Sequence, residues 1–137
     1  SLRPLLAVAY VSSLATKLSD TLASEVGKAY GKTCYLSTTL KRVPPGTEGA
    51  VSLEGTLAGF AGSVLAALYA VAVGLTPRQA MAPVIIAAFV ATTCESWLGA
   101  GAQGKVKWLT NEVINFLNTL IGAGVGAALS FRLFNLY

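Results

Sequence analysis

Four apolar stretches, each close to the length needed to cross a lipid bilayer, dominate this sequence and restrict what it can fold into. Helices are predicted from about Leu5 to Ala29, Ala50 to Leu75, Ala80 to Leu98 and Trp108 to Phe131. A transmembrane helix needs about 20 mostly apolar residues. Only 12% of the 137 residues are charged, against about 25% in soluble domains. We therefore predict an all-α fold, a polytopic transmembrane bundle of about four helices that forms a single integral-membrane domain over residues 1–137.

The composition excludes several kinds of chemistry. The chain has no histidine and two cysteines, Cys34 and Cys94. Zinc clusters, Cys/His or Ser/His nucleophile pairs and a histidine general base are therefore not expected. The net charge of +4 suits anionic lipid or nucleotide phosphate. The basic residues are spread between helices without interleaved aromatic residues, so no nucleic acid partner is predicted.

The first helix becomes polar along one face in its second half. At 100° per residue, the face holds the following polar residues: Ser13, Lys17, Asp20, Thr21, Ser24 and Lys28, with Glu25 on its flank. Charged residues inside a membrane are costly and are commonly paired or functional. Two interpretations stay open for Lys17 and Asp20. They form an ion pair at i,i+3 spacing that shields two awkward charges, or they belong to a phosphate-handling site.

The distribution of basic residues predicts an orientation. Residues 28–50 and 99–108 lie on one side of the bundle, because the second and third helices form a hairpin between them. That side holds six basic residues: Lys28, Lys32, Lys41, Arg42, Lys105 and Lys107. The other side holds three: Arg3, Arg78 and Arg132. Positive charge favours the inner side of a membrane, so we expect the first set to face the cytoplasm, or the stroma in a plastid.

Acidic and polar residues at the same side predict a site for magnesium and phosphate. The expected metal ligands are four acids: Asp20, Glu25, Glu95 and Glu112. Mg²⁺ is commonly bound by one or two carboxylates together with substrate phosphates. The expected catalytic residues are Asp20, Glu25 and Lys17. The expected phosphate or nucleotide ligands are these: Ser24, Lys32, Lys41, Arg42, Gly46, Thr47, Asn111 and Asn115.

Some of these polar residues have simpler interpretations that stay open. Pro45-Gly46 favours a tight turn with positive φ at Gly46, and Thr47 and Ser52 lead into a helix N-terminus. They either bind an anion there or serve as turn and cap. Asn111 and Asn115, with Asn118 on the same face, either line a cavity or join helices by hydrogen bonds.

Glycine spacing carries two further predictions. Gly55, Gly59 and Gly62 lie on related faces of the second helix, which is typical of close helix packing. The segment Gly27–Thr33 is one residue short of a P-loop and follows a helix, so a P-loop is not predicted.

The order and spacing of four motifs resemble one known family. The motifs are SDTLASEVG at Ser19–Gly27, PGTEGAVS at Pro45–Ser52, ESWLGA at Glu95–Ala100 with Gln103 and Gly104, and NEVIN at Asn111–Asn115. They are similar to those of a polytopic membrane family, long described as a domain of unknown function, that includes the plastid phytyl-phosphate kinase of vitamin E synthesis. The similarity to the plant plastid branch is closest over residues 15–56. Glu95 and Glu112 depart from it, because many members carry aspartate there.

The resemblance implies an activity. It implies transfer of a phosphoryl group from a nucleoside triphosphate, CTP in particular, to phytyl phosphate, which gives phytyl diphosphate for tocopherol and phylloquinone synthesis. Magnesium, a chloroplast membrane and partners among prenyl phosphates and membrane lipids follow from it. It also implies helices upstream of Ser1, so we expect the C-terminal part of a longer protein.

The main alternative is a non-catalytic role. The chain would then be an accessory subunit of a larger, photosynthetic membrane complex, or a transporter of an anionic lipid head group. A homo-oligomer or a larger membrane complex is compatible with either activity.

Overall fold

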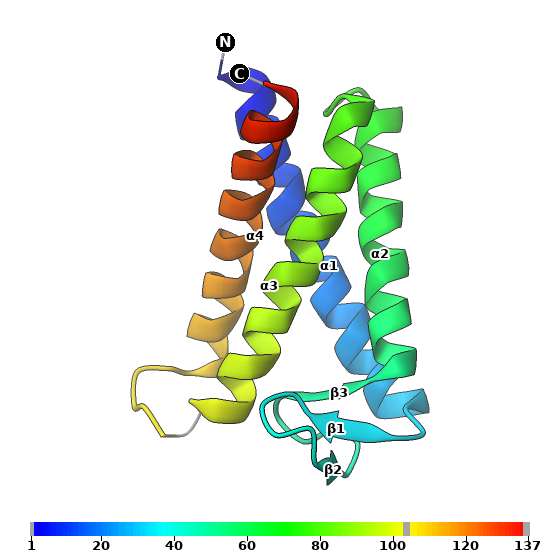
Figure 1. Cartoon of the computed structure of the whole chain (residues 1–137), viewed down its shortest axis with the longest axis vertical. Helices are drawn as coiled ribbons and strands as arrows, with labels where there is room; N and C mark the ends of the chain where they lie inside the picture. The colour runs from blue at the N-terminus through cyan, green and yellow to red at the C-terminus, as the bar shows by residue number, and fades with distance from the viewer. Residues whose placement is uncertain (1, 103–104, 136–137) are drawn as a thin grey trace.

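The computed structural model describes residues 2–102 and 105–135, so the motif residues Gln103 and Gly104 lie outside it. Its long helices are α1 (Arg3–Tyr30), α2 (Leu53–Ala72), α3 (Met81–Gly101) and α4 (Asn111–Phe134), with a short 3₁₀ helix η1 (Arg78–Ala80) before α3 (Figure 1). Within these described residues, three segments are long and apolar enough to cross a membrane: α2, η1 with α3, and α4. The 28-residue α1, about 42 Å long, packs among them. The predicted helical membrane bundle is confirmed.

The segment between α1 and α2, predicted as a loop, contains a small sheet. Its antiparallel strands are β1 (Cys34–Leu36), β2 (Arg42–Val43) and β3 (Ala50–Ser52), in the order β2-β1-β3. Cys34 pairs with Val43 on one side and with Ser52 on the other. The predicted start of the second helix at Ala50 is wrong because residues 50–52 pair with β1. The N-cap Ser52 then begins α2 by accepting a hydrogen bond from the Gly55 amide at 3.1 Å.

Helix α1 is the centre of the bundle because it packs against each of α2, α3 and α4. Small residues permit the close approach of α2. A Cβ atom on Gly55 would lie 2.5 Å from the Ala23 carbonyl oxygen, and one on Gly59 would lie 2.9 Å from the Ser19 carbonyl oxygen. The predicted packing face of these glycines is confirmed. Gly122 and Gly126 of α4 face α1 similarly, since a Cβ on Gly122 would collide with the Thr16 hydroxyl and one on Gly126 with the Ser12 hydroxyl.

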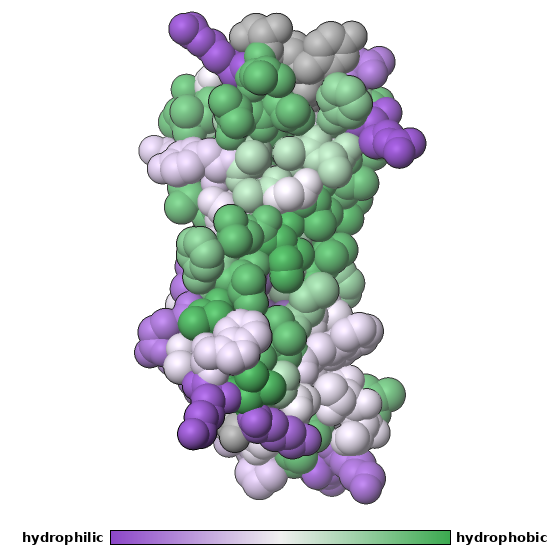
Figure 2. Space-filling view, turned by 90° about the vertical axis from the view of Figure 1, so that its left-hand side faces the viewer, coloured by the Kyte–Doolittle hydropathy of each residue, from purple (hydrophilic) through white to green (hydrophobic). Residues whose placement is uncertain are grey.

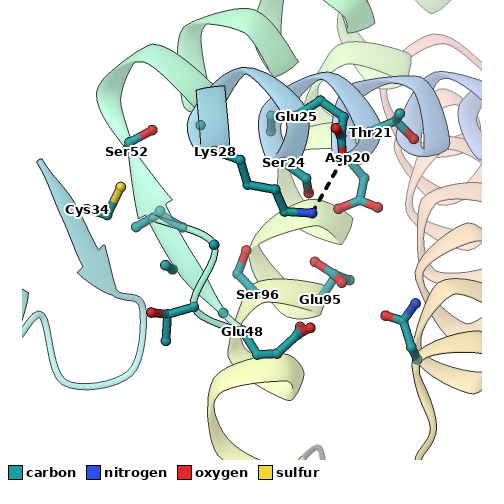
Figure 3. A pocket seen from close by; sticks show the side chains of 18 of the residues that line it. Asp20, Thr21, Ser24, Glu25, Lys28, Cys34, Glu48, Ser52, Glu95 and Ser96 are labelled. Atoms are coloured by element: carbon teal, nitrogen blue, oxygen red, sulfur yellow. Dashed lines mark hydrogen bonds and ion pairs between the residues drawn. The ribbon is translucent and has the colours of Figure 1, made fainter. Parts of the chain in front are cut away.

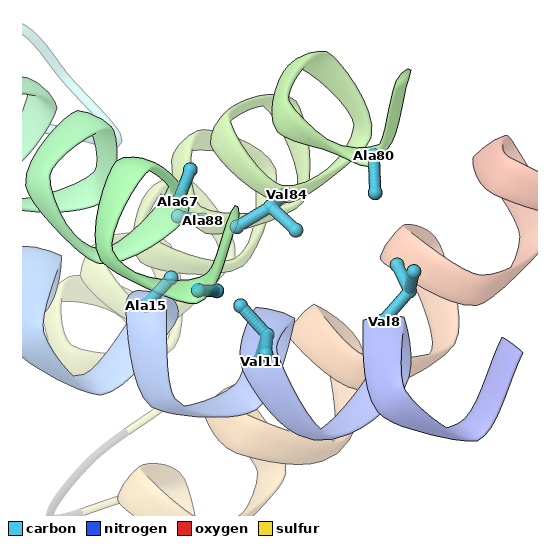
Figure 4. Close-up of a cluster of buried hydrophobic side chains, with 8 residues drawn as sticks. Val8, Val11, Ala15, Ala67, Ala80, Val84 and Ala88 are labelled. Carbon is cyan, nitrogen blue, oxygen red and sulfur yellow. The ribbon is translucent and has the colours of Figure 1, made fainter. Parts of the chain in front are cut away.

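The apolar core lies at the end of the bundle away from the sheet. Val8 and Val11 of α1 meet Ala67 of α2 and Val84 and Ala88 of α3 (Figure 4). These side chains are small, and all five are at most 5% exposed. Helices in lipid are held together mainly by such close packing, because a bilayer provides little hydrophobic force between them.

The surface matches an integral membrane protein. Figure 2 shows a hydrophobic band between two more hydrophilic ends. In Figure 1, both termini and the α2–α3 connection lie at one end, and the sheet lies at the other with the α3–α4 connection. Residues 28–50 and the described part of 99–108 therefore share one end, as predicted. Large exposed side chains such as Leu65, Phe89 and Phe116 are explained by contact with lipid.

Candidate functional site

A polar pocket of about 270 Å³ lies at the sheet end of the bundle. Five parts of the fold form it: α1 from Lys17 to Lys28, Cys34 of β1, the turn before β3 with β3 itself, the end of α3 and the start of α4. In Figure 3, Asp20 and Lys28 of α1, Glu48 of the turn before β3, and Glu95 and Ser96 of α3 surround a common space. The polar and charged residues that line it are Lys17, Asp20, Thr21, Ser24, Glu25, Lys28, Thr47, Glu48, Ser52, Glu95, Ser96, Asn111 and Asn115.

Lys17 joins α1 to α4 at the inner wall of this pocket. Its ammonium group lies 3.3 Å from Oδ2 of Asp20 and donates a hydrogen bond to Oδ1 of Asn115. Asp20 is only 7% exposed, whereas the Lys17 side chain is 45% exposed. The ion-pair interpretation is therefore confirmed. The Lys17 side chain also lines the pocket, and its role at a phosphate site stays a prediction.

A second carboxylate faces Asp20 from α3. Glu95 is half-buried and interacts electrostatically with Asp20, Lys17 and Glu48. Figure 3 shows the carboxyl groups of Asp20 and Glu95 directed toward each other across the pocket. Three acids beside one ammonium leave an excess of negative charge, which a bound cation would offset.

The outer wall carries a more exposed pair. The Lys28 ammonium lies 3.4 Å from Oε1 of Glu25, and both side chains are more than half exposed, at 56% and 68%. Such a pair is held weakly, because water screens it. Its ammonium is therefore available to an incoming anion, next to the Ser24 hydroxyl (Figure 3).

The turn before β3 closes the pocket from the sheet side. Gly46 and Gly49 have φ values of +89° and +75°, so the positive φ predicted for Gly46 is confirmed. Thr47 donates its hydroxyl hydrogen to the Pro44 carbonyl at 2.7 Å. The Thr47 and Ser52 hydroxyls thus serve the turn and the helix cap, and the turn's contribution to an anion site would come mainly from its backbone.

The structure brings together most of the predicted site residues. Nine line the pocket: Lys17, Asp20, Ser24, Glu25, Gly46, Thr47, Glu95, Asn111 and Asn115. Four do not line it: Lys32, Lys41, Arg42 and Glu112. The Lys32 amide donates to Oε1 of Glu54 at 3.4 Å. Lys41 directly precedes β2 and Arg42 lies in it, and both are exposed. Glu112 is exposed in the first turn of α4.

The predicted set of four metal-binding acids is not assembled. Within residues 2–102 and 105–135, no three Asp, Glu or Cys side chains are grouped so as to hold a metal ion. Glu112 lies in the first turn of α4 and is exposed, whereas Asn115, about one turn later, accepts a hydrogen bond from Lys17 of α1. Asp20 and Glu95 remain as the facing acidic pair.

Sequence reasoning missed several lining residues, among them Cys34, Glu48 and Ser96. Glu48 lies inside the PGTEG turn and Ser96 directly follows Glu95, so both belong to motifs already singled out. Cys34 carried no such signal. It is 4% exposed and reaches the pocket only because β1 pairs with β3.

Apolar spanning helices with a charged pocket at one end define a helical integral membrane protein with a polar site at the membrane boundary. Comparison with known proteins narrows this class. The chain belongs to the family described as integral membrane protein DUF92, whose profile matches residues 1–123. The family membership predicted from the motifs is thereby confirmed.

Three known proteins are similar to the chain over most of its length. It is 57% identical over 120 residues to an uncharacterized membrane protein of Synechocystis sp. (88% of this chain, 46% of the relative). It is 51% identical over 117 residues to protein VTE6, chloroplastic, of Arabidopsis thaliana (83% and 35%). It is 31% identical over 119 residues to an uncharacterized membrane protein of Methanocaldococcus jannaschii (87% and 49%). The chain thus spans a third to a half of the length of these relatives. No solved structure matches it.

Proposed function

We propose that the chain carries the phosphate-binding half of a prenyl-phosphate kinase. The reaction would move the γ-phosphoryl group of a nucleoside triphosphate, CTP in particular, to a phosphate oxygen of phytyl phosphate. The products would be phytyl diphosphate and a nucleoside diphosphate. The observation that carries the proposal is the pocket at the membrane boundary, where Lys17, Asp20 and Glu95 meet within an apolar bundle.

The charges of the pocket suit two phosphate groups and a metal ion. Asp20 and Glu95 would hold Mg²⁺, which would offset the charge of the phosphates when bound. Two protein carboxylates are a common number for this ion, because substrate phosphates complete its coordination. Lys17 and Lys28 would orient the anions. Lys32, Lys41 and Arg42, outside the pocket, would attract them from solution.

The acceptor requires little proton chemistry. A phosphate monoester is already an anion, so it needs no strong general base, which fits a chain without histidine. The main difficulty is to bring like charges together, and positioned cations achieve this. The identity to a chloroplast relative supports a chloroplast membrane. The excess of basic residues at the sheet end would place the pocket on the stromal side, and a role in vitamin E synthesis would follow from the proposed reaction.

The proposal is tested by phosphoryl transfer with purified protein, phytyl phosphate, labelled CTP and Mg²⁺. Asp20→Asn and Glu95→Gln should each lower the rate at least about 100-fold, as removal of transition-state charge stabilisation commonly does. EDTA should abolish the reaction. The matched control is Glu112→Gln, which should keep the rate because Glu112 lies outside the pocket. Equal rates in all three variants would contradict the proposed site.

A second candidate function, transport of an anionic lipid head group, is favoured by one observation. Among the described residues, buried polar atoms of Ser12, Thr16, Asn118 and Ser130 have no hydrogen-bond partner. Ser12 and Thr16 face the glycines of α4, so these atoms form a polar line along the α1–α4 contact. Lipid-phosphate flux across proteoliposomes without nucleotide would support transport, and flux that requires nucleotide turnover would argue against it.

A further inference from the structure

A second cavity lies directly beside the polar pocket and differs from it in character. Its volume is about 500 Å³, and its lining is mostly apolar, whereas the lining of the first pocket is mostly polar. Ala23, Val51 and Ser96 line both. The two cavities are therefore adjacent across these three residues, one polar and one apolar.

The apolar cavity lies between α2 and α3. Phe60 of α2 and Phe89 and Trp97 of α3 line it while remaining 53%, 57% and 57% exposed. In Figure 1 the two helices are joined at the η1 end and separate toward the sheet. Each packs more closely on α1 than on the other. The cavity is thus a groove that opens sideways, toward the lipid surrounding the bundle.

Two further features limit the shape of this groove. Gly59 and Ala23 lie at the tight contact of α1 with α2, where a Cβ on Gly59 would be 3.1 Å from the Ala23 Cβ. Thr38 and Leu40, from the turn between β1 and β2, line the groove at the sheet end. Leu40 holds a left-handed conformation with φ of 56°. The β1–β2 turn therefore bounds the groove at the sheet end, and the α1–α2 contact bounds it on another side.

We propose that this groove binds the hydrocarbon tail of a phosphate ester whose head group occupies the polar pocket. The inference rests on the proposed function only for the identity of the head group. A phosphate beside Lys17 or Lys28 would lie next to Ala23 and Ser96, where the groove begins. The volume falls in the range of about 300–1,000 Å³ that is typical of sites for small organic ligands.

The groove would orient the bound tail more than it would add hydrophobic free energy to binding. A tail that leaves the bilayer for an apolar groove exchanges one apolar environment for another, so little apolar surface is removed from water. What the groove adds is a fixed direction for the tail, which places the phosphate at the carboxylate pair. It would therefore discriminate between long and short tails.

The test uses the intrinsic fluorescence of Trp97. The chain has two tryptophans, so Trp108→Phe leaves Trp97 as the single reporter. The protein in lipid nanodiscs is titrated with octadecyl phosphate brominated in mid-chain, because bromine quenches a nearby indole. We expect saturable quenching that unlabelled octadecyl phosphate reverses. Brominated phosphatidylcholine should not reproduce this quenching. Quenching that rises linearly and equally for both brominated lipids would overturn the proposal.

Two substitutions fill the groove in that background. Thr56→Phe and Thr93→Phe place a ring among its lining residues, and Leu57→Phe, on the neighbouring exposed surface outside it, is the matched control. Each filling variant should weaken octadecyl phosphate binding at least tenfold and leave pentyl phosphate binding within twofold. The control should change neither. Equal binding of octadecyl phosphate in both filling variants and the control would reject the groove.

The outcomes also separate the groove from the kinase reaction, because the binding measurement needs no nucleotide. Groove-dependent binding without phosphoryl transfer would keep the groove and reject the kinase. Phosphoryl transfer could instead depend on tail length in the same way in Thr56→Phe and Leu57→Phe. That result would support the proposed kinase reaction and reject the groove as the tail site.

Discussion

At the scale of single residues, Lys17 has the most demanding position in the site. It is half-exposed, yet it is the cation nearest to the buried Asp20. A carboxylate in such a position is stable only with a partner, because burial disfavours its charged form. The same ammonium reaches α4 through Asn115. Lys17 therefore links the stability of the bundle to the charge of the pocket.

Replacement of this lysine should destabilise the protein. We expect Lys17→Met to lower the free energy of unfolding by about 1–2 kcal/mol, less than for a fully buried pair because Lys17 is half-exposed. The measurement is denaturant unfolding in detergent. Lys28→Met, in an exposed pair, should change it by less than about 0.5 kcal/mol. A larger effect of Lys28→Met than of Lys17→Met would contradict this account.

A second residue-scale prediction concerns the helix contact at Gly55. An added methyl group in Gly55→Ala would meet the Ala23 carbonyl oxygen at 2.5 Å, and overpacking of this kind costs about 1–3 kcal/mol. The same change at Gly124 meets nothing within 4 Å and should leave stability equal or slightly higher. Thermal unfolding of the two variants side by side checks the difference. Equal melting temperatures would show that α1 and α2 can separate freely.

At the scale of elements, the turn before β3 positions one wall of the pocket against α3. A Cβ on Gly49 would lie 2.4 Å from the Ala100 amide nitrogen, whereas one on Gly46 would meet nothing within 4 Å. Both residues have positive φ, so both resist substitution by strain. Only at Gly49 would an added methyl group also collide with a neighbouring residue, Ala100.

The two glycines therefore give a matched pair of variants. Both alanine substitutions cost about 1–2 kcal/mol in the left-handed conformation. Only Gly49→Ala pushes the turn, with Glu48, away from α3. We expect it to weaken binding of octadecyl phosphate at least about tenfold, which corresponds to about 1.4 kcal/mol. Gly46→Ala should weaken it less than about threefold. Similar losses in the two variants would mean that strain, not the contact with Ala100, determines the effect.

The sequence predicted the helices well but did not predict the sheet, and one physical reason explains both results. A long run of apolar residues indicates a helix without reference to distant parts of the chain. The existence and order of all four long helices were therefore predicted. The β1 strand is three residues long, and Cys34 pairs with Ser52, far along the chain. Such short strands carry no period of their own. Their pairing depends on contacts that only the folded chain provides.

At the scale of the whole molecule, site residues on a single helix were predicted correctly. Those whose position depends on how separate elements pack together were not. Helical periodicity correctly placed Lys17, Asp20 and Ser24 on one face, because that face belongs to one helix. Glu112 was misplaced because the rotation of α4 relative to α1 decides whether it or Asn115 faces the pocket. That rotation follows from Gly122 and its neighbours packing on α1. Lys41 lies outside the pocket, exposed in the connection between β1 and β2.

The orientation in the membrane gives a prediction for the whole molecule. Single cysteines are introduced as Lys41→Cys at the sheet end and Arg78→Cys at the opposite end, with Cys34 and Cys94 replaced by alanine. A membrane-impermeant thiol reagent should modify Lys41→Cys only from the side where nucleotide is present, and Arg78→Cys only from the other side. Modification of both from one side would exclude a spanning bundle with this arrangement.

The junction between sheet and bundle has a consequence for motion. Strand β3 ends at Ser52 and α2 begins at Leu53 without an intervening loop, and Ser52 both pairs with Cys34 and caps the helix. Opening of the sheet would release the first turn of α2 at the same moment. In amide hydrogen exchange the amides of Cys34 and Gly55 should therefore exchange at a common rate, as one cooperative unit. The water-exposed sheet and the first turn of the lipid-facing helix α2 would then open and close together.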